Sequence, residues 1–330
     1  MISAMKHLQS ASRTLAHHVQ QRYTSTAAAE SLETIRARML AQPAKLVDDY
    51  LTPTPSHLLS LCLYSASPHT SSPPLSFASA LYAAPLLPGA HLVHFPIRDA
   101  PHTLFPDGTD ATHLPTRALP KRMWEGGSVA YRAGWQVRMK LDGRRALCSE
   151  KIADVRQARG SGLLVDVQRR YAAVPDGMGA VRYVLEDADI VERRTLVFMP
   201  ADSAVGSPRG RIVKCPYTPQ KTYPFTPSDL MLFNFSALTY NAHKIHYTTG
   251  YDGFSRPVVH GPLTQALMLH VLSIEFPDMP VQKLDYSNIA PLFANDELTV
   301  CLARRNGAVR VWINGPDGGM AVRGLAVLEE

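Results

Sequence analysis

Apolar positions change their spacing along the chain in a way that outlines two similar halves. In the first half, residues 28–51 carry apolar side chains at helical spacing after Ser31, a good helix cap, and predict a helix. Residues 127–199 then alternate apolar and polar positions in four stretches and predict four antiparallel strands. The region between them is rich in Pro, Ser and His, and it contains one further helix candidate, residues 76–87, before a long loop.

The pattern repeats after residues 200–211, a segment rich in Gly, Pro and Ser that is typical of a linker. Residues 225–240 carry Thr-Pro-Ser at their start and predict a helix. Residues 261–276 show the apolar stripe of an amphipathic helix. Three strand candidates follow, and the last predicts a hairpin that turns at Gly315–Gly319. Each half therefore combines a long helix with an antiparallel sheet, so the sequence predicts an α+β fold built twice.

Composition and charge narrow the classes of function. With 330 residues, 45% of them hydrophobic and 19% charged, the chain is long enough for two domains with a buried core. The formal net charge of +6 would suit an acidic partner such as nucleic acid, CoA or acyl carrier protein. The basic residues are scattered, however, so we expect most of them on a solvated surface and predict no nucleic-acid partner. The densest groups are Arg169-Arg170, Arg193-Arg194 and Arg304-Arg305. No apolar run approaches the ~20 residues that span a bilayer, so no membrane partner is predicted.

The amino terminus has the composition of a targeting segment. Residues 1–29 contain no Asp or Glu, but they include Lys6, Arg13 and Arg22 among many Ser, Thr and Ala residues. Acid-free starts that contain Arg and much Ser are typical of mitochondrial transit peptides. We therefore expect a leader over residues 1–25 and a protein of the mitochondrial matrix. The alternative is a disordered tail that carries no address.

The candidate chemistry lies in the segment LTYNAHKIHYTTG, which contains Asn241, His243 and His246. Two close histidines can bind a metal, but no Asp or Glu occurs between Asp229 and Asp252. The spacing of the histidines also differs from the HExxH frame of zinc enzymes. We therefore predict no metal site, and zinc stays the lesser alternative. For each histidine taken alone, the competing interpretation is a hydrogen-bonded structural residue.

A second segment, RPVVHGPLTQALML, opens the amphipathic helix with Gly261 and Pro262. Proline fits the first helical position because the N–H it lacks would have no partner there. Glycine lets a ligand approach the backbone, and its N–H near the positive end of the helix dipole can donate to an oxyanion. A neutral histidine together with such a donor suits proton abstraction beside a carbonyl, or addition of water to an enoyl group.

Together the segments NAHKIH and RPVVHGPL resemble the hydratase-type hot-dog proteins, which carry D-x-N-P-x-H followed by P-[IV]-x-H-G. Asn241 stands where that signature has Asp. The chain is more similar still to the MaoC-like subfamily of fungal mitochondrial 3-hydroxyacyl-thioester dehydratases (type 2) and mesaconyl-C4-CoA hydratases, in which asparagine is usual at this place. RMWEGGSV (residues 122–129) and IAPLFANDELTV (residues 289–300) support this resemblance, which covers roughly Leu32 to the end.

This resemblance implies a double hot dog, in which two helix-wrapped antiparallel sheets of one chain mimic the dimer of shorter relatives. Residues 30–199 would form an N-terminal hot-dog domain that is non-catalytic and accommodates the acyl group. Residues 212–330 would form the C-terminal catalytic domain. The RMWEGG stretch is expected to shape the first domain's turn and the seam between the domains.

The resemblance also implies syn elimination of water from a (3R)-hydroxyacyl thioester, without a metal or redox cofactor. His246 would move the protons, Asn241 would position the hydroxyl or water, and the Gly261 N–H would stabilise the enolate-like oxygen. Four further residues are expected at substrate-binding positions. They are His243, also expected as a structural hydrogen-bonding residue, His260, expected to orient the loop before the helix, Trp124 and Tyr247.

The implied setting is mitochondrial type II fatty-acid synthesis, with acyl thioesters of acyl carrier protein or CoA as partners and a monomeric or homodimeric enzyme. Two alternatives share the fold. One is a hydratase of C4 or C5 dicarboxylyl-CoA thioesters, of mesaconyl or itaconyl type, in which Lys244 or Arg256 would face the distal carboxylate. The other is a non-catalytic hot-dog protein that binds thioesters. A thioesterase is less favoured because the motif offers no carboxylate to activate water.

Overall fold

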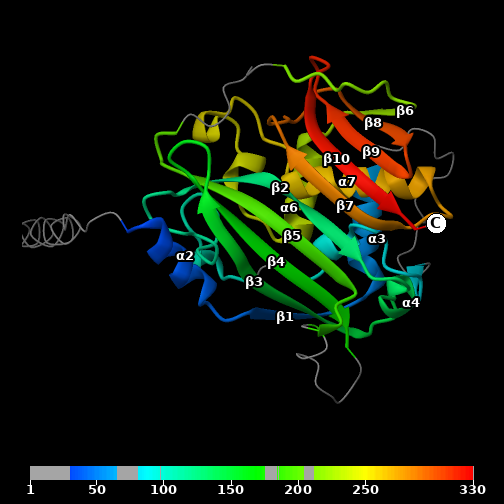
Figure 1. The fold of residues 1–330 in the computed structure, drawn as a ribbon, viewed down its shortest axis with the longest axis horizontal. Coiled ribbons are helices and arrows are strands. Elements are labelled where there is room, and N and C mark those ends of the chain that lie inside the picture. Colours follow the sequence, from blue (N-terminus) through cyan, green and yellow to red (C-terminus); the bar gives the residue numbers. More distant parts are fainter. Residues whose placement is uncertain are drawn as a thin grey trace, which may run out of the picture.

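The computed structural model describes residues 30–64, 81–96, 98–174, 184, 186–203 and 212–329. The expected leader and most of the expected linker therefore lie outside the described residues. Ten strands form one antiparallel sheet in the order β1-β3-β4-β5-β2-β7-β10-β9-β8-β6 (Figure 1). The strands are β1 (Lys45–Tyr50), β2 (Lys121–Tyr131), β3 (Arg145–Gln157), β4 (Leu163–Ala173), β5 (Ile190–Met199), β6 (Lys221–Phe225), β7 (Val281–Asn288), β8 (Leu298–Arg305), β9 (Ala308–Asn314) and β10 (Met320–Leu328).

The sheet consists of two equivalent five-stranded halves. β1 to β5 come from the first half of the chain and β6 to β10 from the second, and β2 pairs with β7 at the junction. Reading outward from that junction, β5, β4, β3 and β1 occupy the places that β10, β9, β8 and β6 occupy on the other side. This arrangement confirms the α+β double hot-dog fold. The division into two domains stays a prediction, because one sheet runs through both.

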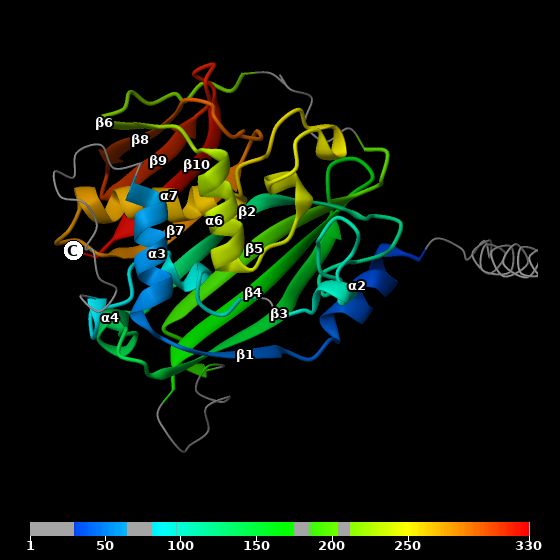
Figure 2. The ribbon, with the colours of Figure 1, turned by 180° about the vertical axis from the view of Figure 1, so that it is seen from behind.

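Helices cover one face of the sheet (Figure 2). α7 (Gly261–Glu275) packs on the second half-sheet because it is apolar on nearly every side and buries most of its length. α3 (Pro53–Leu63) and α6 (Asp229–Thr239) lie side by side over the same face. α6 starts where Ser228 Oγ accepts the Met231 N–H, as its sequence predicted. The remaining helical segments are α2 (Leu32–Leu40), α4 (Trp135–Arg138), η3 (Ala90–Leu92), η4 (Pro101–Thr103), η5 (Lys244–His246) and η6 (Tyr251–Gly253).

The first half departs from the predicted elements at its helices. The helix expected over residues 28–51 is shorter, because α2 ends at Leu40 and β1 then pairs with β3. Pro43, which cannot donate a backbone hydrogen bond, separates the two. The described part of the second candidate, residues 81–87, follows turns rather than a helix. α3 instead occupies Pro53–Leu63, since prolines are tolerated in a first helical turn.

The two half-sheets differ on the face that the helices cover. In the second half, apolar residues of β8 and β9 such as Val300 and Val311 belong to the same core as α7. In the first half, a buried row of charged residues crosses three strands: Glu150 of β3 pairs with Arg169 of β4, which pairs with Glu192 of β5. The first half thus keeps buried charge where the second half is apolar.

Candidate active site

The loop after α6 places Asn241 at its start. Tyr240 adopts the left-handed conformation that ends the helix, and the Asn241 N–H donates back to the Ser236 carbonyl at 2.8 Å. The side-chain Oδ1 of Asn241 accepts the His243 N–H at 3.0 Å. Because that bond needs the carbonyl oxygen, the Nδ2 amide of Asn241 is the group available to a ligand.

A loop from the first half holds this segment in place. The Lys244 N–H donates to the Asp107 carbonyl at 2.8 Å. Gly108 packs so closely that a Cβ there would lie 1.8 Å from the Ala242 carbonyl oxygen, and its φ of +85° is left-handed. Only glycine satisfies both conditions. The loop of the second half that carries Asn241 and His243 is therefore fixed by the first half.

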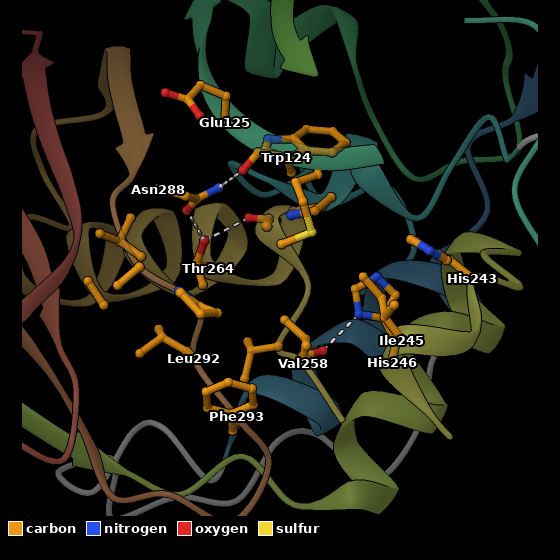
Figure 3. A pocket seen from close by; sticks show the side chains of 18 of the residues that line it. Trp124, Glu125, His243, Ile245, His246, Val258, Thr264, Asn288, Leu292 and Phe293 are labelled. Atoms are coloured by element: carbon orange, nitrogen blue, oxygen red, sulfur yellow. Dashed lines mark hydrogen bonds between the residues drawn. The ribbon is translucent and has the colours of Figure 1, made fainter. Parts of the chain in front are cut away.

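His246 is buried, and one of its ring nitrogens is committed to the backbone. Nδ1 lies 2.7 Å from the Val258 carbonyl (Figure 3). A carbonyl can only accept, so Nδ1 carries the hydrogen and Nε2 keeps a lone pair. Burial lowers the His246 pKa to about 4. The Val258 carbonyl acts against this shift, and the charge of Arg122 adds to it. At neutral pH the ring is therefore a neutral acceptor at Nε2.

His260 supports His246 from behind. The two rings stack with their centroids 3.7 Å apart and an interplanar angle of 18°. His260 Nε2 hydrogen bonds with Ser236 Oγ at 2.8 Å. Burial and the neighbouring histidines hold the His260 pKa well below its usual value, so this ring is also neutral. His260 is fully buried and is not among the cavity-lining residues, so it fits a positioning role better than substrate contact.

Gly261 begins α7 directly against Trp124. A Cβ at Gly261 would lie 2.6 Å from Trp124 Cγ, closer than real side chains approach. The indole is fixed in turn, because Trp124 Nε1 donates to Tyr286 OH at 2.8 Å. Asn288 Nδ2 also donates to the Trp124 carbonyl at 2.9 Å. Gly261 is the first residue of the helix, so its N–H has no acceptor inside the helix and is available to donate a hydrogen bond to an anion.

One cavity of about 900 Å³ brings the three expected catalytic residues together. Its lining includes Asn241, His246 and Gly261, together with Trp124 and His243. Apolar side chains complete this part of the wall (Figure 3), namely Ile245, Val258, Leu292 and Phe293. The cavity lies beside the β2–β7 junction, so both halves of the chain contribute to it.

His243 and Tyr247 have different positions. His243 lines the main cavity and a second cavity of about 510 Å³, and burial, together with His246 and Arg122 beside it, lowers its pKa well below the usual value. Its Nε2 lies 3.8 Å from Asp107 Oδ2, too far for a hydrogen bond. Tyr247 is 45% exposed and lines neither cavity, and its hydroxyl donates to the Ala242 carbonyl instead. The structure thus gives Tyr247 a place in the loop rather than against a substrate.

Arg122 is a cavity residue that the sequence did not single out. It lies on β2 two positions from Trp124, so both side chains point to the same face. Its Nη1 contacts Asp110 Oδ2 at 2.8 Å, and it contributes to the low pKa of His246. The sequence signal that could have identified Arg122 is the alternation of side chains along a strand, which places Arg122 and Trp124 of RMWEGG on the same face. Among the described residues, no three His, Cys, Asp or Glu side chains cluster as metal ligands, and no helix is long and apolar enough to cross a membrane.

The family described as hydroxyacyl-thioester dehydratase type 2 matches residues 89–294, which include the cavity residues named above on both sides of the junction. The chain belongs to this family. It is 30% identical over 247 residues to mesaconyl-C(4)-CoA hydratase of Chloroflexus aurantiacus, an alignment that covers 72% of this chain and 82% of the relative. It is 22% identical to the mitochondrial hydroxyacyl-thioester dehydratase type 2 of Schizosaccharomyces pombe, over 69% of this chain and 80% of the relative.

Solved structures agree with this hydroxyacyl-thioester dehydratase type 2 family at the level of fold. A MaoC-like dehydratase from Phytophthora capsici superposes with a TM-score of 0.61 and 14% identity, covering 89% of this chain and 98% of the other. The HtdX protein of Mycobacterium tuberculosis superposes with a TM-score of 0.55 and 15% identity, covering 85% of this chain and 99% of the other. At such identities the likeness establishes the double hot-dog fold and leaves the chemistry to the site.

Proposed function

We propose that the protein is a hydro-lyase that interconverts (3R)-3-hydroxyacyl thioesters and trans-2-enoyl thioesters. One observation carries the proposal. A neutral histidine with a free Nε2 lone pair, His246, lines the same cavity as the helix-start N–H of Gly261. Proton transfer beside a thioester carbonyl needs both a base and a donor for the oxygen that becomes negative. The relatives, which are named as dehydratases and a hydratase, support the same reaction.

In the proposed dehydration, His246 Nε2 removes the proton from Cα of the substrate. The electron pair of the C–H bond moves toward the thioester oxygen, where the Gly261 N–H stabilises the charge. The Cα–Cβ double bond then forms as the Cβ–O bond breaks. The hydroxyl leaves with the proton that His246 has taken, so the products are the enoyl thioester and water. Hydration is the reverse sequence.

The Nδ2 amide of Asn241 would donate a hydrogen bond to the departing hydroxyl or the incoming water. Its Oδ1 is already engaged by the His243 N–H. Because an amide cannot accept a proton, Asn241 orients this oxygen and His246 carries both protons. His243, whose low pKa keeps it neutral, would form the adjoining wall.

The proposed cellular setting rests on the names of the relatives. Two yeast relatives are named as mitochondrial, which supports a mitochondrial location and, with the acid-free leader, the matrix. Those names support a role in fatty-acid synthesis, and the Chloroflexus relative supports the dicarboxylyl-CoA alternative. Both settings require the same chemistry at His246. The carrier, acyl carrier protein or CoA, and the monomeric or dimeric state stay predictions.

The His246→Ala variant tests the proposal. We expect hydration of crotonyl-CoA, followed as loss of the enoyl-thioester absorbance, to fall by about 100- to 10,000-fold in kcat/KM. The control is His102→Ala, which removes an exposed histidine outside both cavities and is expected to change nothing. Full turnover by a folded His246→Ala protein contradicts the mechanism. Binding without turnover by the unaltered protein favours the non-catalytic alternative.

A further inference from the structure

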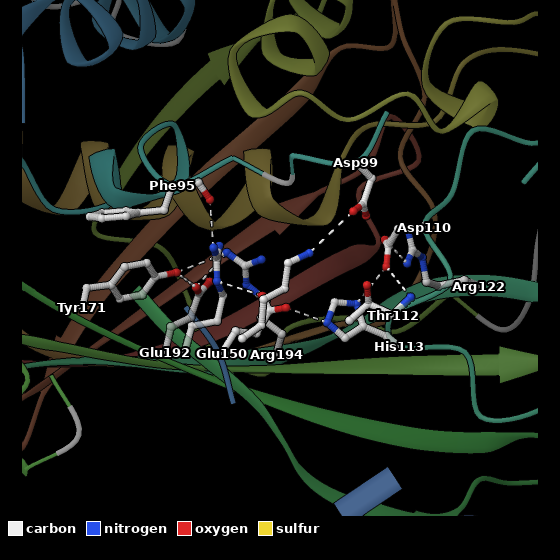
Figure 4. A network of polar contacts seen from close by, with 12 residues as sticks. Phe95, Asp99, Asp110, Thr112, His113, Arg122, Glu150, Tyr171, Glu192 and Arg194 are labelled. Atoms are coloured by element: carbon white, nitrogen blue, oxygen red, sulfur yellow. Dashed lines mark hydrogen bonds and ion pairs between the residues drawn. The ribbon is translucent and has the colours of Figure 1, made fainter. Parts of the chain in front are cut away.

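The main cavity has a second part, in the first half of the chain, that the proposed chemistry does not use. We name it the inner chamber and define it by the polar residues that line it there. These residues are Asp110, His113, Arg122, Arg169 and Arg194. All five are largely buried, with side chains between 3% and 15% exposed. Figure 4 shows this network beneath the helical face, with Arg122 and Asp110 at one end and Tyr171 at the other.

The network rests on the charged row that crosses β3, β4 and β5. Arg169 Nε lies 3.0 Å from Glu150 Oε2, and its Nη2 donates to the Phe95 carbonyl at 2.8 Å. Arg194 Nη2 lies 2.8 Å from Glu192 Oε2. Burial alone would raise the pKa of Glu150 and Glu192, but the cations beside them hold both below their usual range. Both groups are therefore carboxylates.

The surface of the inner chamber is cationic although carboxylates lie beneath it. Arg169 and Arg194 line the cavity, but their partners Glu150 and Glu192 do not. Asp110 is the one carboxylate of the described network that reaches the surface of the chamber. A ligand that enters would meet three guanidinium groups and an imidazole there.

His113 also lines the chamber and contacts two of the carboxylates. Its Nε2 lies 3.0 Å from Glu150 Oε1, and its Nδ1 lies 3.5 Å from Asp110 Oδ1. Only the first of these contacts is a hydrogen bond, so His113 helps to hold Glu150 beside Arg169.

Two arginines of the chamber have unsatisfied donors. The Nε atoms of Arg169 and Arg194 are buried without a hydrogen-bond acceptor of suitable geometry. A buried donor of a charged group that lacks an acceptor is costly. A bound carboxylate would accept from a guanidinium in the geometry that arginine prefers.

The chamber also lies close to the reacting atoms. The Arg194 guanidinium carbon is 5.3 Å from the centroid of the Trp124 ring, and that indole contacts Gly261. The chamber therefore begins about one aromatic ring away from the position proposed for the thioester oxygen. A carboxylate at the end of a short acyl group could therefore reach Arg194.

We propose that the inner chamber binds a carboxylate at the far end of the acyl group, so that the substrates are short enoyl and 3-hydroxyacyl thioesters with a terminal carboxylate. This inference rests on the proposed function and names its substrate class. Arg194 and Arg169 are the binding residues, in place of Lys244 and Arg256 expected from the sequence. Arg256 is already paired with Asp296 through two contacts, at 2.6 and 3.1 Å.

The first test compares substrates on the unaltered enzyme. Glutaconyl-CoA and trans-2-pentenoyl-CoA have five-carbon acyl groups that differ in ending in a carboxylate or a methyl group, and trans-2-decenoyl-CoA adds a long apolar chain. We expect kcat/KM for glutaconyl-CoA to exceed that of the other two by at least ~100-fold. Equal or greater turnover of the neutral thioesters overturns the carboxylate assignment and leaves the proposed reaction standing. Turnover of none of the three contradicts the proposed reaction itself.

The second test assigns the preference to the chamber. Arg194→Met keeps an unbranched side chain against Trp124 and removes the charge, so the ratio of kcat/KM for glutaconyl-CoA over pentenoyl-CoA should fall at least ~10-fold. The matched control is Arg193→Met, on the adjacent residue that faces outward and pairs with Asp166. We expect the control to keep the wild-type ratio. An unchanged ratio in folded Arg194→Met protein overturns the assignment, and if that variant does not fold, the substrate comparison decides.

Discussion

Gly261 and Trp124 are in such close contact that no larger residue fits at position 261: a Cβ there would meet three atoms of Trp124 at 2.6 to 2.8 Å. The indole cannot easily move away, because Tyr286 and Asn288 hold its ring and its carbonyl. The glycine is therefore required by packing as well as by the approach of a ligand. Its backbone N–H and the indole position depend on each other.

The first prediction follows from this contact. In Gly261→Ala the methyl group must displace Trp124 or the start of α7, so we expect a loss of about 1–3 kcal/mol in the free energy of unfolding. The N–H at position 261 shifts with the backbone, and hydration of an accepted enoyl thioester should fall by about 100-fold. Urea unfolding and kcat/KM are the measurements. Gly315→Ala, where the nearest atom would lie at 3.4 Å, is the control and should cost little stability; a similar loss there would contradict the packing argument.

The second prediction concerns the amide at position 241. Asn241→Asp keeps an oxygen for the His243 N–H but places a carboxylate in the cavity beside His246. A nearby negative charge favours the imidazolium, so the His246 pKa should rise from about 4. Because the base must be neutral, activity should then be lost at a higher pH as the medium is acidified. The measurement is the acid limb of the pH profile of kcat/KM for both proteins. Coincident acid limbs would show that Asn241 does not face His246 in the manner proposed.

The third prediction concerns acid stability. Burial lowers the pKa of His91 to about 4, and in the unfolded chain the same ring titrates near 6.5. At pH 5 the unfolded state therefore binds a proton that the folded state does not, and stability falls as the pH drops below 6.5. Each such histidine contributes a loss of about 2 kcal/mol between pH 7 and pH 5.

His91→Phe tests this linkage by removing one titrating group from the core. Urea unfolding at pH 7 and pH 5 should show a decrease in stability that is smaller by about 2 kcal/mol in the variant than in the unaltered protein. The difference between the two pH values is the readout, since the substitution itself changes packing at both. An identical decrease in both proteins would mean that His91 takes up its proton without unfolding.

The sequence predicted the second half of the protein well because its patterns there are uninterrupted. α6 and α7 appear where a cap or a proline precedes an apolar stripe, and the hairpin turns at Gly315–Gly319 as expected. The three residues expected to act in catalysis, Asn241, His246 and Gly261, line one cavity. Their roles in catalysis stay predictions. His260 and Tyr247, which were expected at substrate-binding positions, do not line this cavity, because one stacks behind His246 and the other lies on the surface.

The inner chamber could not be predicted in the same way. Arg169-Arg170 and Arg193-Arg194 resemble surface charge when read as pairs, and Arg170 and Arg193 do face away from the core. Neighbouring residues of a strand point to opposite sides, however, so the other member of each pair must face inward. Whether an inward arginine is tolerated depends on Glu150 and Glu192, which only strand register brings beside it. The spacing of residues along the sequence does not show which residues of neighbouring strands lie side by side.

The junction between β2 and β7 has a consequence for how the two half-sheets can change. In a dimer of identical shorter chains, every substitution on the inner face would occur twice, once in each copy. Here the two faces are encoded separately, so Arg169 can stand opposite a hydrocarbon core without imposing a second arginine upon it. Joining the halves in one chain has thus broken a symmetry, and it allows one half to specialise in the reaction while the other selects the molecule that reacts.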